Sequence, residues 1–371
     1  MMSEEQKTGD RISANNTRKR VAVAMSGGID SSVAAAILVD QGLEVIGLTA
    51  HMWKENSRCC SEEDVKGAQK VAWFLGIRHY VLNASEVFSK NVVDPFVSEY
   101  MQGRTPSPCV VCNQMIKFGF LLARAMQFDC TALATGHYAR VEQRGGFYRL
   151  LKAKDCARDQ SYFLHRLSQR QLAHSIFPLG DWIKKKDVVA YTRNRSLPIT
   201  PRKESRDLCF VPDGEYGQFV EGRVPEAKKK GRITDTNGRD IGTHEGIHRY
   251  TVGQRSGLGV SCSVPLYVTH LDAQENVVEV GKREEAFAQT CFLEDVSWIA
   301  GRPPENNRLY DLRIRYQHDG VPARIHHVGD SCVRVDFLAP QFAVTPGQAA
   351  VFYDGDEVLG GGWIASAEPA E

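Results

Sequence analysis

The sequence predicts an α/β protein in which an open parallel sheet flanked by helices is followed by a small mixed domain and a C-terminal β-barrel. Short apolar segments alternate with segments of helical period over the first half of the chain. That alternation is typical of a parallel sheet with helices on both faces. After Pro212 the helical period is lost, and from Cys291 onward short alternating segments with glycine turns favour an all-β module.

The predicted strands of the parallel sheet are short apolar runs at 21–24, 44–50, 79–82 and 131–134. Predicted helices begin near Asp30 and at residues 62, 91, 112 and 186, where apolar residues recur at helical spacing. Further short strands are expected at 207–211 and 246–252. Barrel strands are expected at 312–316, 323–327, 332–337 and 349–353.

A chain of 371 residues is longer than one hydrophobic core usually organises, so several domains are expected. We divide it into a disordered polar lead-in, a catalytic α/β domain, a small central domain and the barrel. The corresponding residues are 1–19, 20–212, 213–283 and 284–367.

Composition limits the class of protein. Ten cysteines without an apolar secretion signal favour a reducing compartment, so we expect a cytoplasmic protein. No apolar run suggests a membrane span, and we expect a monomer with no membrane partner. The net charge of +1 does not by itself indicate nucleic-acid binding. Basic runs at 18–20, 184–186, 202–203 and 228–232 are each interpreted as solvated surface, unless the fold gathers them on one face.

The most informative stretch is Ser26-Gly27-Gly28-Ile29-Asp30-Ser31, between a predicted strand and a predicted helix. The glycines permit a sharp turn and close approach of a ligand, and a helix N-terminus favours an anion. No lysine follows Gly28, so this is not the common P-loop. An ordinary glycine turn is the alternative, but the position of the motif argues against it. The pattern resembles the signature of the ATP pyrophosphatases, which cut ATP between its α and β phosphates.

Two cysteines and a histidine stand at informative places. Cys112 is expected to open a helix after an extended proline loop, and a thiol at a helix N-terminus has its pKa lowered. Cys209 lies in a short apolar run, where burial as a small hydrophobe is the default interpretation. Gly136 ends a predicted strand, where a ligand could approach closely. His137 is either a structural residue or a ligand contact.

With these residues in view, the sequence resembles the bacterial and organellar tRNA-specific 2-thiouridylase family from about Arg20 to about Ile364. The resemblance implies a domain of the ATP-pyrophosphatase (adenine nucleotide alpha hydrolase-like) type, a small central domain and a C-terminal β-barrel. The matching blocks occur in the same order along the chain, at 26–32, 103–106, 112–118, 134–138, 159–164, 209–210, 251–255 and 344–348.

The resemblance implies ATP-dependent 2-thiolation of the wobble uridine, position 34, of tRNA. AMP is transferred to the C2 oxygen with loss of pyrophosphate, and sulfur from a cysteine persulfide then displaces AMP. The implied cofactors are ATP and Mg²⁺, with no protein metal ligands assigned. The implied partners are tRNA and either a persulfide-carrying sulfur-relay protein or a cysteine desulfurase.

Site residues follow from the same resemblance. Cys112 resembles the nucleophile of the family and Cys209 the cysteine that carries the persulfide. The positions implied to bind ATP are Ala24, Met25, Ser26, Gly27, Gly28, Ile29, Asp30, Ser31, Ala50 and Gly136. The positions implied to bind the target base or the rest of the tRNA are Ser107, Pro108, Cys109, Arg158, Asp159, Gln160, Arg315 and Tyr316.

Several alternatives stay open. Some relatives carry Asp where this chain has Cys109, and Cys109, Cys112 and Cys209 together could instead hold an iron–sulfur cluster. Ala50 replaces a larger apolar residue of some relatives, so a backbone contact to adenine is expected there. Cys59 and Cys60 have no assigned role. An amide-forming ligase such as GMP or NAD synthetase would explain the loop but not the cysteines. A non-catalytic RNA-binding protein would need neither the loop nor the cysteines.

Overall fold

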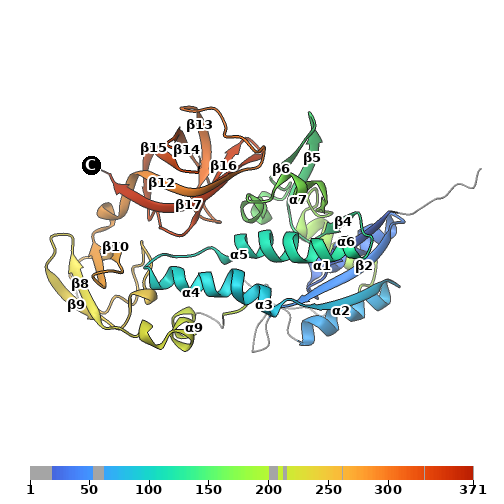
Figure 1. Cartoon of the computed structure of the whole chain (residues 1–371), viewed down its shortest axis with the longest axis horizontal. Helices are drawn as coiled ribbons and strands as arrows, with labels where there is room; N and C mark the ends of the chain where they lie inside the picture. The colour runs from blue at the N-terminus through green and yellow to red at the C-terminus, as the bar shows by residue number, and fades with distance from the viewer. Residues whose placement is uncertain are drawn as a thin grey trace, which may run out of the picture.

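The computed structural model describes residues 19–52, 62–199, 208–211, 215–260, 262–329 and 331–370. These residues form three separate sheets, and Figure 1 colours their strands by residue number from blue to red. Most of the expected lead-in, 1–18, and Cys59 and Cys60 lie outside the described residues, as does the basic pair at 202–203. The domain boundaries drawn from the sequence remain predictions.

The first sheet has five strands in the order β3-β2-β1-β4-β7, and every neighbouring pair is parallel. Its central strand buries Val21, Ala22 and Val23, because helices cover both faces and leave no solvated side. This confirms the predicted open parallel sheet. The strands are β1 (Arg20–Ala24), β2 (Glu44–His51), β3 (Arg78–Asn83), β4 (Ala132–Ala134) and β7 (Ser175–Ile176).

Helices α1 (Ile29–Asp40) and α2 (Glu62–Phe74) follow the first two strands as expected. Two longer helical stretches come next, and both begin earlier than predicted, at Ser85 rather than 91 and at Pro108 rather than 112. The first consists of α3 (Ser85–Phe88), η1 (Ser89–Val93) and α4 (Asp94–Met101). The second consists of α5 (Pro108–Val111), η2 (Cys112–Leu121) and α6 (Leu122–Gln127).

The remaining helical segments of this half of the chain are short. Residues 156–164 contain two 3₁₀ turns, and the helix predicted from 186 begins at Lys184. These segments are η3 (Cys156–Arg158), η4 (Ser161–Leu164), α7 (Gln169–Ala173), η5 (Lys184–Val188), α8 (Val189–Asn194) and α9 (Tyr216–Arg223).

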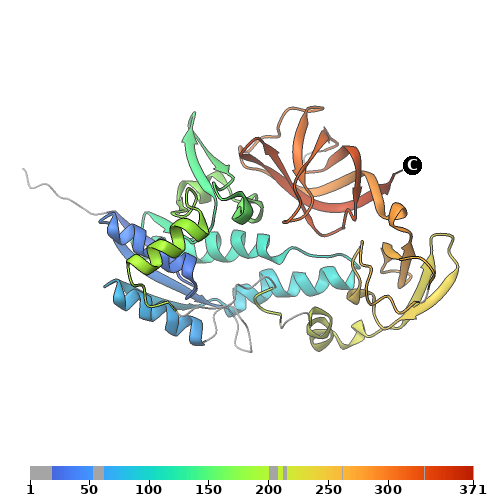
Figure 2. The same cartoon turned by 180° about the vertical axis from the view of Figure 1, so that it is seen from behind.

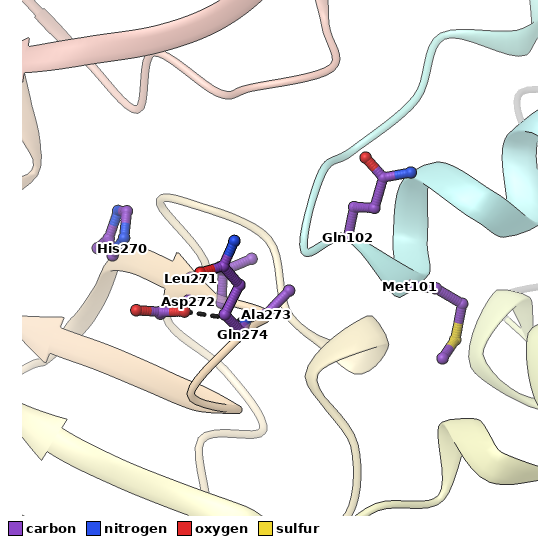
Figure 3. Close-up of a pocket in the computed structure, with 7 residues that line it drawn as sticks. All are labelled: Met101, Gln102, His270, Leu271, Asp272, Ala273 and Gln274. Atoms are coloured by element: carbon purple, nitrogen blue, oxygen red, sulfur yellow. Dashed lines mark hydrogen bonds between the residues drawn. The ribbon is translucent and has the colours of Figure 1, made fainter.

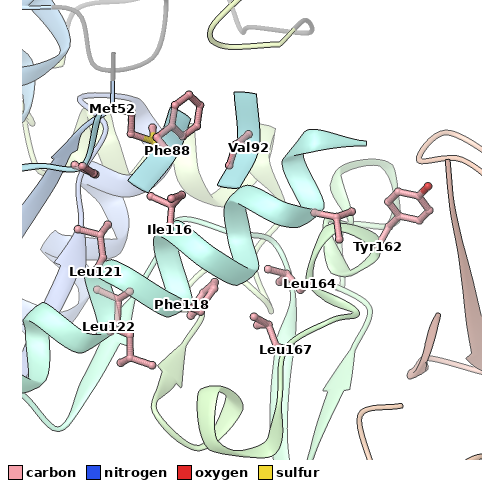
Figure 4. Close-up of a cluster of buried hydrophobic side chains, with 14 of the residues drawn as sticks. Met52, Phe88, Val92, Ile116, Phe118, Leu121, Leu122, Tyr162, Leu164 and Leu167 are labelled. Atoms are coloured by element: carbon pink, nitrogen blue, oxygen red, sulfur yellow. The ribbon is translucent and has the colours of Figure 1, made fainter. Parts of the chain in front are cut away.

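The largest hydrophobic core lies where these two long helical stretches pack on the sheet (Figure 4). Phe88 and Val92 from the first stretch and Ile116 and Phe118 from the second are each at most 2% exposed. By length and composition alone, the helix Pro108–Gln127 could cross a membrane, which the sequence analysis did not foresee. Its apolar residues are accounted for by this core, in which the helix is partly buried.

The second sheet has four strands in the order β10-β11-β8-β9 and buries Ile233, Val268, Val278 and Val280. The strand predicted at 246–252 is wrong, because Ile247–Arg249 form the 3₁₀ turn η7. Ile247 and Tyr250 are both buried there, and their spacing of three suits one face of a helical turn. The elements of this unit are η6 (Pro225–Ala227), β8 (Gly231–Asp235), β9 (Asp240–His244), η7, β10 (Tyr267–Asp272) and β11 (Val277–Gly281).

The third sheet closes into a six-stranded antiparallel barrel in the order β12-β15-β14-β13-β16-β17, because β12 also pairs with β17. This confirms the predicted C-terminal barrel. A hairpin of the first half of the chain, which was not predicted from the sequence, extends this sheet because β6 pairs with β17. The elements are η8 (Arg283–Ala286), β12 (Phe287–Trp298), β13 (Leu309–Arg313), β14 (Val321–His327), β15 (Val333–Phe342), β16 (Ala349–Asp354) and β17 (Glu357–Pro369), with the hairpin strands β5 (Arg140–Arg144) and β6 (Phe147–Leu151).

The barrel stands over the helical stretches that contain α4 and α5, and the second sheet lies beyond the end of α4 (Figures 1 and 2). The loop 103–107, between α4 and α5, contacts both of these units. Gly103 packs so closely that a Cβ there would lie 3.2 Å from the Cβ of Leu271 in the second sheet. The Thr105 hydroxyl donates a hydrogen bond to the Thr251 hydroxyl, 3.1 Å away.

The same loop is fixed to the barrel. The Arg104 guanidinium pairs with Glu99 at 2.7 Å and with Glu294 on β12 at 2.6 Å. The Thr105 backbone N–H donates to the Pro346 carbonyl at 2.8 Å, and the Gln348 side chain donates to the Thr105 carbonyl at 2.9 Å. Three blocks of the family resemblance, 103–106, 251–255 and 344–348, therefore meet at one junction.

This junction predicts a large effect of Gly347→Ala. Gly347 has a φ of +89°, and an added Cβ would lie 2.9 Å from the Thr105 backbone N and O. Gly355 is the matched control, because its φ is +61° but no atom lies within 4 Å of its Cβ position. Both alanines cost about 1–2 kcal/mol for the left-handed backbone, and only Gly347→Ala adds a backbone clash. Thermal unfolding of both variants should show a larger loss for Gly347→Ala, whereas equal losses would contradict the close packing.

Candidate active site

The glycine loop lies between the end of β1 and the first turn of α1 and is ordered by its own hydrogen bonds. Gly27 has a φ of +73°, and a Cβ there would lie 2.5 Å from the Asp64 carbonyl oxygen, so only glycine fits. The Ser26 N–H donates to Ser31 Oγ at 3.2 Å, and Ser31 Oγ donates to the Gly28 carbonyl at 3.1 Å. The cap residue of α1 is Gly28, which has no side chain to satisfy the first N–H groups. A phosphate is a fitting partner for them.

Asp30, in the first turn of α1, is held by two side chains from later in the chain. The Tyr138 hydroxyl donates to Oδ1 at 2.7 Å, and the Lys184 ammonium lies 2.7 Å from Oδ2. Burial and the nearby Asp30 carboxylate raise the pKa of Tyr138. Lys184 is itself buried, so its interpretation as solvated surface is wrong. It brings a positive charge to the phosphate end of α1, and no local sequence signal revealed it.

Gly136, two residues after the end of β4, and Ala50 in β2 lie near this loop. A Cβ at Gly136 would lie 2.6 Å from the Asp30 carbonyl carbon and the Ser31 nitrogen, so close packing on α1 accounts for this glycine without a ligand. Ala50 is buried in β2, where only its backbone is left for a contact to adenine. The neighbouring Thr49 hydroxyl donates to the Met25 carbonyl at 2.7 Å and fixes the start of the loop.

His137 is buried and hydrogen-bonded on both ring nitrogens. Nε2 lies 3.2 Å from the Lys117 ammonium, which can only donate, so Nδ1 carries the ring proton and donates to Thr135 Oγ1 at 2.7 Å. Burial and the Lys117 charge lower the pKa of His137 well below its ordinary value. These internal partners favour the structural interpretation of His137. They also join the helix that carries Cys112 to the strand end beside the glycine loop.

Cys112 is not at the start of its helix. The helical stretch begins with Pro108 as its first residue, a position that proline favours, so the free N–H groups of the first turn surround Cys109. Cys112 is the fifth residue of the stretch, is half-buried and packs against the largest core. The expectation that Cys112 opens the helix is therefore wrong by one turn. Cys109 is exposed.

Cys209 lies in a turn and not in a strand, since Val211 N–H donates to the Leu208 carbonyl at 3.2 Å. The next residue, Phe210, is buried and meets Phe88 and Phe96 edge-on, with ring centroids 5.5 and 5.1 Å apart. Phe210 thus anchors the half-buried Cys209 to the same core that Cys112 packs against. The structure therefore places both cysteines beside one core, which the sequence alone could not show.

Tyr316 of the barrel and Cys109 at the start of the helix, both implied to contact the substrate, lie close to each other. The Tyr316 ring lies 4.3 Å from the Phe163 ring, centroid to centroid. Burial raises the pKa of Tyr316, and Asp159 and the Cys109 thiol are close enough to raise it further. Ser107 and Pro108, just before Cys109, are half-buried and buried, respectively. A barrel residue therefore faces the first turn of the helix that carries Cys112.

Comparison with known proteins covers almost the whole chain. Three family models match it: a tRNA methyl transferase HUP domain at 19–213, a tRNA methyl transferase PRC-barrel domain at 217–282 and an aminomethyltransferase β-barrel domain at 288–364. A tRNA-specific 2-thiouridylase MnmA from Geotalea uraniireducens is 46% identical over 95% of this chain and 96% of its own length. One of the same name from Geobacter metallireducens is 45% identical over 94% and 98%.

The chain belongs to the tRNA-specific 2-thiouridylase family. Among solved structures, it is similar to NMN synthetase from Francisella tularensis, with 18% identity, a TM-score of 0.34 and coverage of 57% of this chain and 79% of that one. A likeness this slight carries no argument about function.

The Asp159 side chain is engaged inside the protein. Its side chain is 1% exposed and accepts from the Ala153 and Ser161 N–H groups, from Ser161 Oγ, and from Arg313 on β13 at 3.0 Å. All of these partners are internal, so the Asp159 side chain fixes its loop to the barrel. The contact with tRNA that the resemblance implies for this residue stays a prediction.

The other residues implied to contact tRNA, apart from the target base, are more exposed than Asp159. The Gln160 side chain accepts from the Tyr138 N–H at 3.0 Å and is also engaged internally. Arg158 is half-buried, and Arg315 is exposed, with one guanidinium nitrogen 3.3 Å from the Phe342 carbonyl oxygen. Arg158, Arg315 and Tyr316 are thus the residues of this group whose side chains remain accessible.

The metal expectations can be tested against the side chains present. The described residues contain no group of three or more His, Cys, Asp or Glu side chains that could hold a metal ion. Cys109, Cys112 and Cys209 are all described, so in this arrangement they do not fit a cluster, and we derive no step through one. At the glycine loop, both oxygens of Asp30 already have protein partners, so the fit for protein-held Mg²⁺ is poor.

A cavity of about 510 Å³ opens between the end of α4 and the turn after β10 (Figure 3). Met101 and Gln102 line it from one side and residues 270–274 from the other. The Asp272 carboxylate accepts from the Gln274 and Glu275 N–H groups of its own turn. None of the residues implied for the site lines this cavity, so it is not part of the candidate active site.

The buried ion pair between Asp159 and Arg313 predicts that Asp159→Ala lowers the free energy of unfolding by about 3–5 kcal/mol. The substitution leaves the Arg313 guanidinium without its carboxylate partner in a buried place. Asp356→Ala is the matched control. It removes the partner of Arg140 at a similar distance, 2.9 Å, but Asp356 is 68% exposed, so the loss should stay below about 1 kcal/mol. Denaturant unfolding of both variants measures the difference. A loss as small for Asp159 as for Asp356 would contradict the internal role.

Proposed function

We propose that this protein is an ATP-dependent tRNA-uridine 2-sulfurtransferase. Its membership of the 2-thiouridylase family supports this proposal, since the family match covers both the loop and the cysteines. The observation that carries it is the placement of Cys112 and Cys209 beside one core, together with the link that Lys117 and His137 make between the helix of Cys112 and the glycine-loop edge. An amide-forming ligase would leave this placement without a purpose.

In the proposed first step, ATP is a substrate that donates AMP. The uridine C2 oxygen attacks the α phosphorus of ATP, the bond to the β-phosphate oxygen breaks, and pyrophosphate leaves. The ordered loop from Ser26 to Ser31 and the N-terminus of α1 hold the phosphates, and the Lys184 ammonium adds a nearby positive charge. The C2 oxygen, now bound to AMP, has become a good leaving group.

In the proposed second step, Cys209 carries a persulfide. The Cys112 thiolate attacks the Cys209 Sγ, a Cys112–Cys209 disulfide forms, and the terminal sulfur leaves as hydrosulfide. Hydrosulfide then attacks C2 of the activated uridine and displaces AMP. Two electrons from a thiol reductant restore both cysteines. The half-buried position of both thiols limits the access of water to this exchange.

The finer assignments belong to the same proposal. The target is the wobble uridine, position 34, and Mg²⁺ would enter together with the phosphates of ATP. The sulfur comes from a persulfide-carrying relay protein or a cysteine desulfurase. The protein acts as a cytoplasmic monomer. Exposed Cys109 would meet the target base, and half-buried Tyr316 would contact the tRNA near it.

The proposal predicts that Cys112→Ser and Cys209→Ser each abolish 2-thiouridine formation, because each removes one sulfur of the exchange. Cys332→Ser is the matched control, an exposed cysteine of the barrel that should leave product formation unchanged. Mass spectrometry of nucleosides from tRNA incubated with ATP and a persulfide donor measures the product.

Normal thiolation by either Cys112→Ser or Cys209→Ser would overturn the persulfide relay. A protein that binds tRNA but shows no tRNA-stimulated pyrophosphate release would instead be the non-catalytic alternative. Iron and sulfide analysis of anaerobically purified protein, with a single-turnover assay on the same sample, separates the relay from a cluster.

A further inference from the structure

An exposed arginine lies over two aromatic rings where the second sheet meets the barrel. The guanidinium carbon of Arg283 is 5.1 Å from the ring centroid of Phe287 and 4.8 Å from that of Phe342. Phe287 and Phe342 are register partners on β12 and β15, and the Tyr267 ring of β10 meets Phe342 edge-on at 5.6 Å. We call Arg283, Phe287, Phe342, Tyr267 and Arg315 the Arg283 surface.

Arg315 belongs to this surface through its hydrogen bond to the Phe342 carbonyl oxygen. In the part of the chain that the structure describes, neither Arg283 nor Arg315 has a carboxylate within ion-pair distance. Other junction arginines differ, since Arg104 and Arg313 are each paired with acidic side chains. The nearby Glu285 carboxylate is engaged by Thr236 and by the Lys282 N–H. The Arg283 surface therefore presents two guanidinium charges to an external anion.

The surface continues directly from the candidate active site. Tyr316, the neighbour of Arg315, packs against the Phe163 ring at a tilt of 35° and lies close enough to the Cys109 thiol for the thiol to raise its pKa. A molecule whose base reaches Cys109 would thus extend past Arg315 toward Arg283. Stacking on two rings orients the planar guanidinium of Arg283 and reduces the entropy lost on binding, and a guanidinium suits the oxygen geometry of a phosphate.

We propose that the Arg283 surface binds the phosphate backbone of the RNA substrate, away from the base that reacts. This inference rests on the proposed function, because tRNA supplies the phosphates. The surface contributes affinity and orientation and does not read sequence. Arg283 touches neither the reacting atoms nor ATP in this account.

The test uses the full chain and an unmodified tRNA transcript, with the dissociation constant measured over a series of salt concentrations. Arg283→Ala should weaken binding and reduce the slope of log affinity against log salt by about 0.7–0.9, the loss of one phosphate contact. Arg283→Lys keeps the charge and should keep the slope. Arg324→Ala is the matched control. Arg324 is exposed on β14, and its register partner Leu309 is at the end of β13 that lies away from Arg315.

An unchanged slope in Arg283→Ala would overturn the proposal, as would a loss in Arg283→Lys as large as in Arg283→Ala, because that result indicates a structural role. Thiolation by the wild-type protein is measured on the same transcript. If the wild-type protein thiolates tRNA and Arg283→Ala keeps the wild-type salt slope, the proposal for the Arg283 surface is refuted and the proposed function is not. If the wild-type protein binds RNA through Arg283 but makes no 2-thiouridine, only the proposed function is refuted. If the wild-type protein binds no tRNA, the proposed function and the proposal for the Arg283 surface are both refuted.

Discussion

The constraint on which the rest of the structure depends is the loop 103–107. Its backbone and the Arg104 side chain are bound to the barrel, and its Thr105 side chain is bound to Thr251 beside the second sheet. Thr105 bonds to Pro346, Gln348 and Thr251, and Arg104 bridges Glu99 and Glu294. These contacts fix where the next helix begins, at Pro108, and therefore where Cys112 lies. Because three units of the chain meet at one loop, a shift of any of them would move the helix that carries the proposed nucleophile.

Buried ion pairs serve the same purpose at two other places. Asp159 with Arg313 joins the loop after β6 to the barrel, and Asp30 with Lys184 joins the glycine loop to a helix 154 residues later in the chain. Such pairs offset their own desolvation only when the geometry is good, so they add specificity more than stability. The first pair lies near Tyr316, whose pKa Asp159 helps to raise, and the second lies at the phosphate end of α1.

The parallel sheet, the barrel and the glycine loop could be predicted because each has a local pattern: apolar runs, alternation, or glycines at a strand end. Cys112 was placed one turn wrong because a proline that follows a loop also suits the first turn of a helix. Cys209 in a turn, the hairpin β5–β6 that joins the barrel, and buried Lys184 depend on partners far along the chain. The burial of Asp159 also depends on a distant partner, Arg313, and a sequence does not distinguish a buried acid from an exposed one.

The central claim is that the Cys112 and Cys209 thiols can meet beside their shared core. Mild oxidation of the wild-type protein, followed by mass-spectrometric mapping of disulfide-linked peptides, tests it most directly. The account predicts a Cys112–Cys209 disulfide as the main product, formed faster with tRNA and ATP bound. A Cys112 that stays reduced, or that pairs only with Cys109 while Cys209 remains free of Cys112 under all of these conditions, would contradict it.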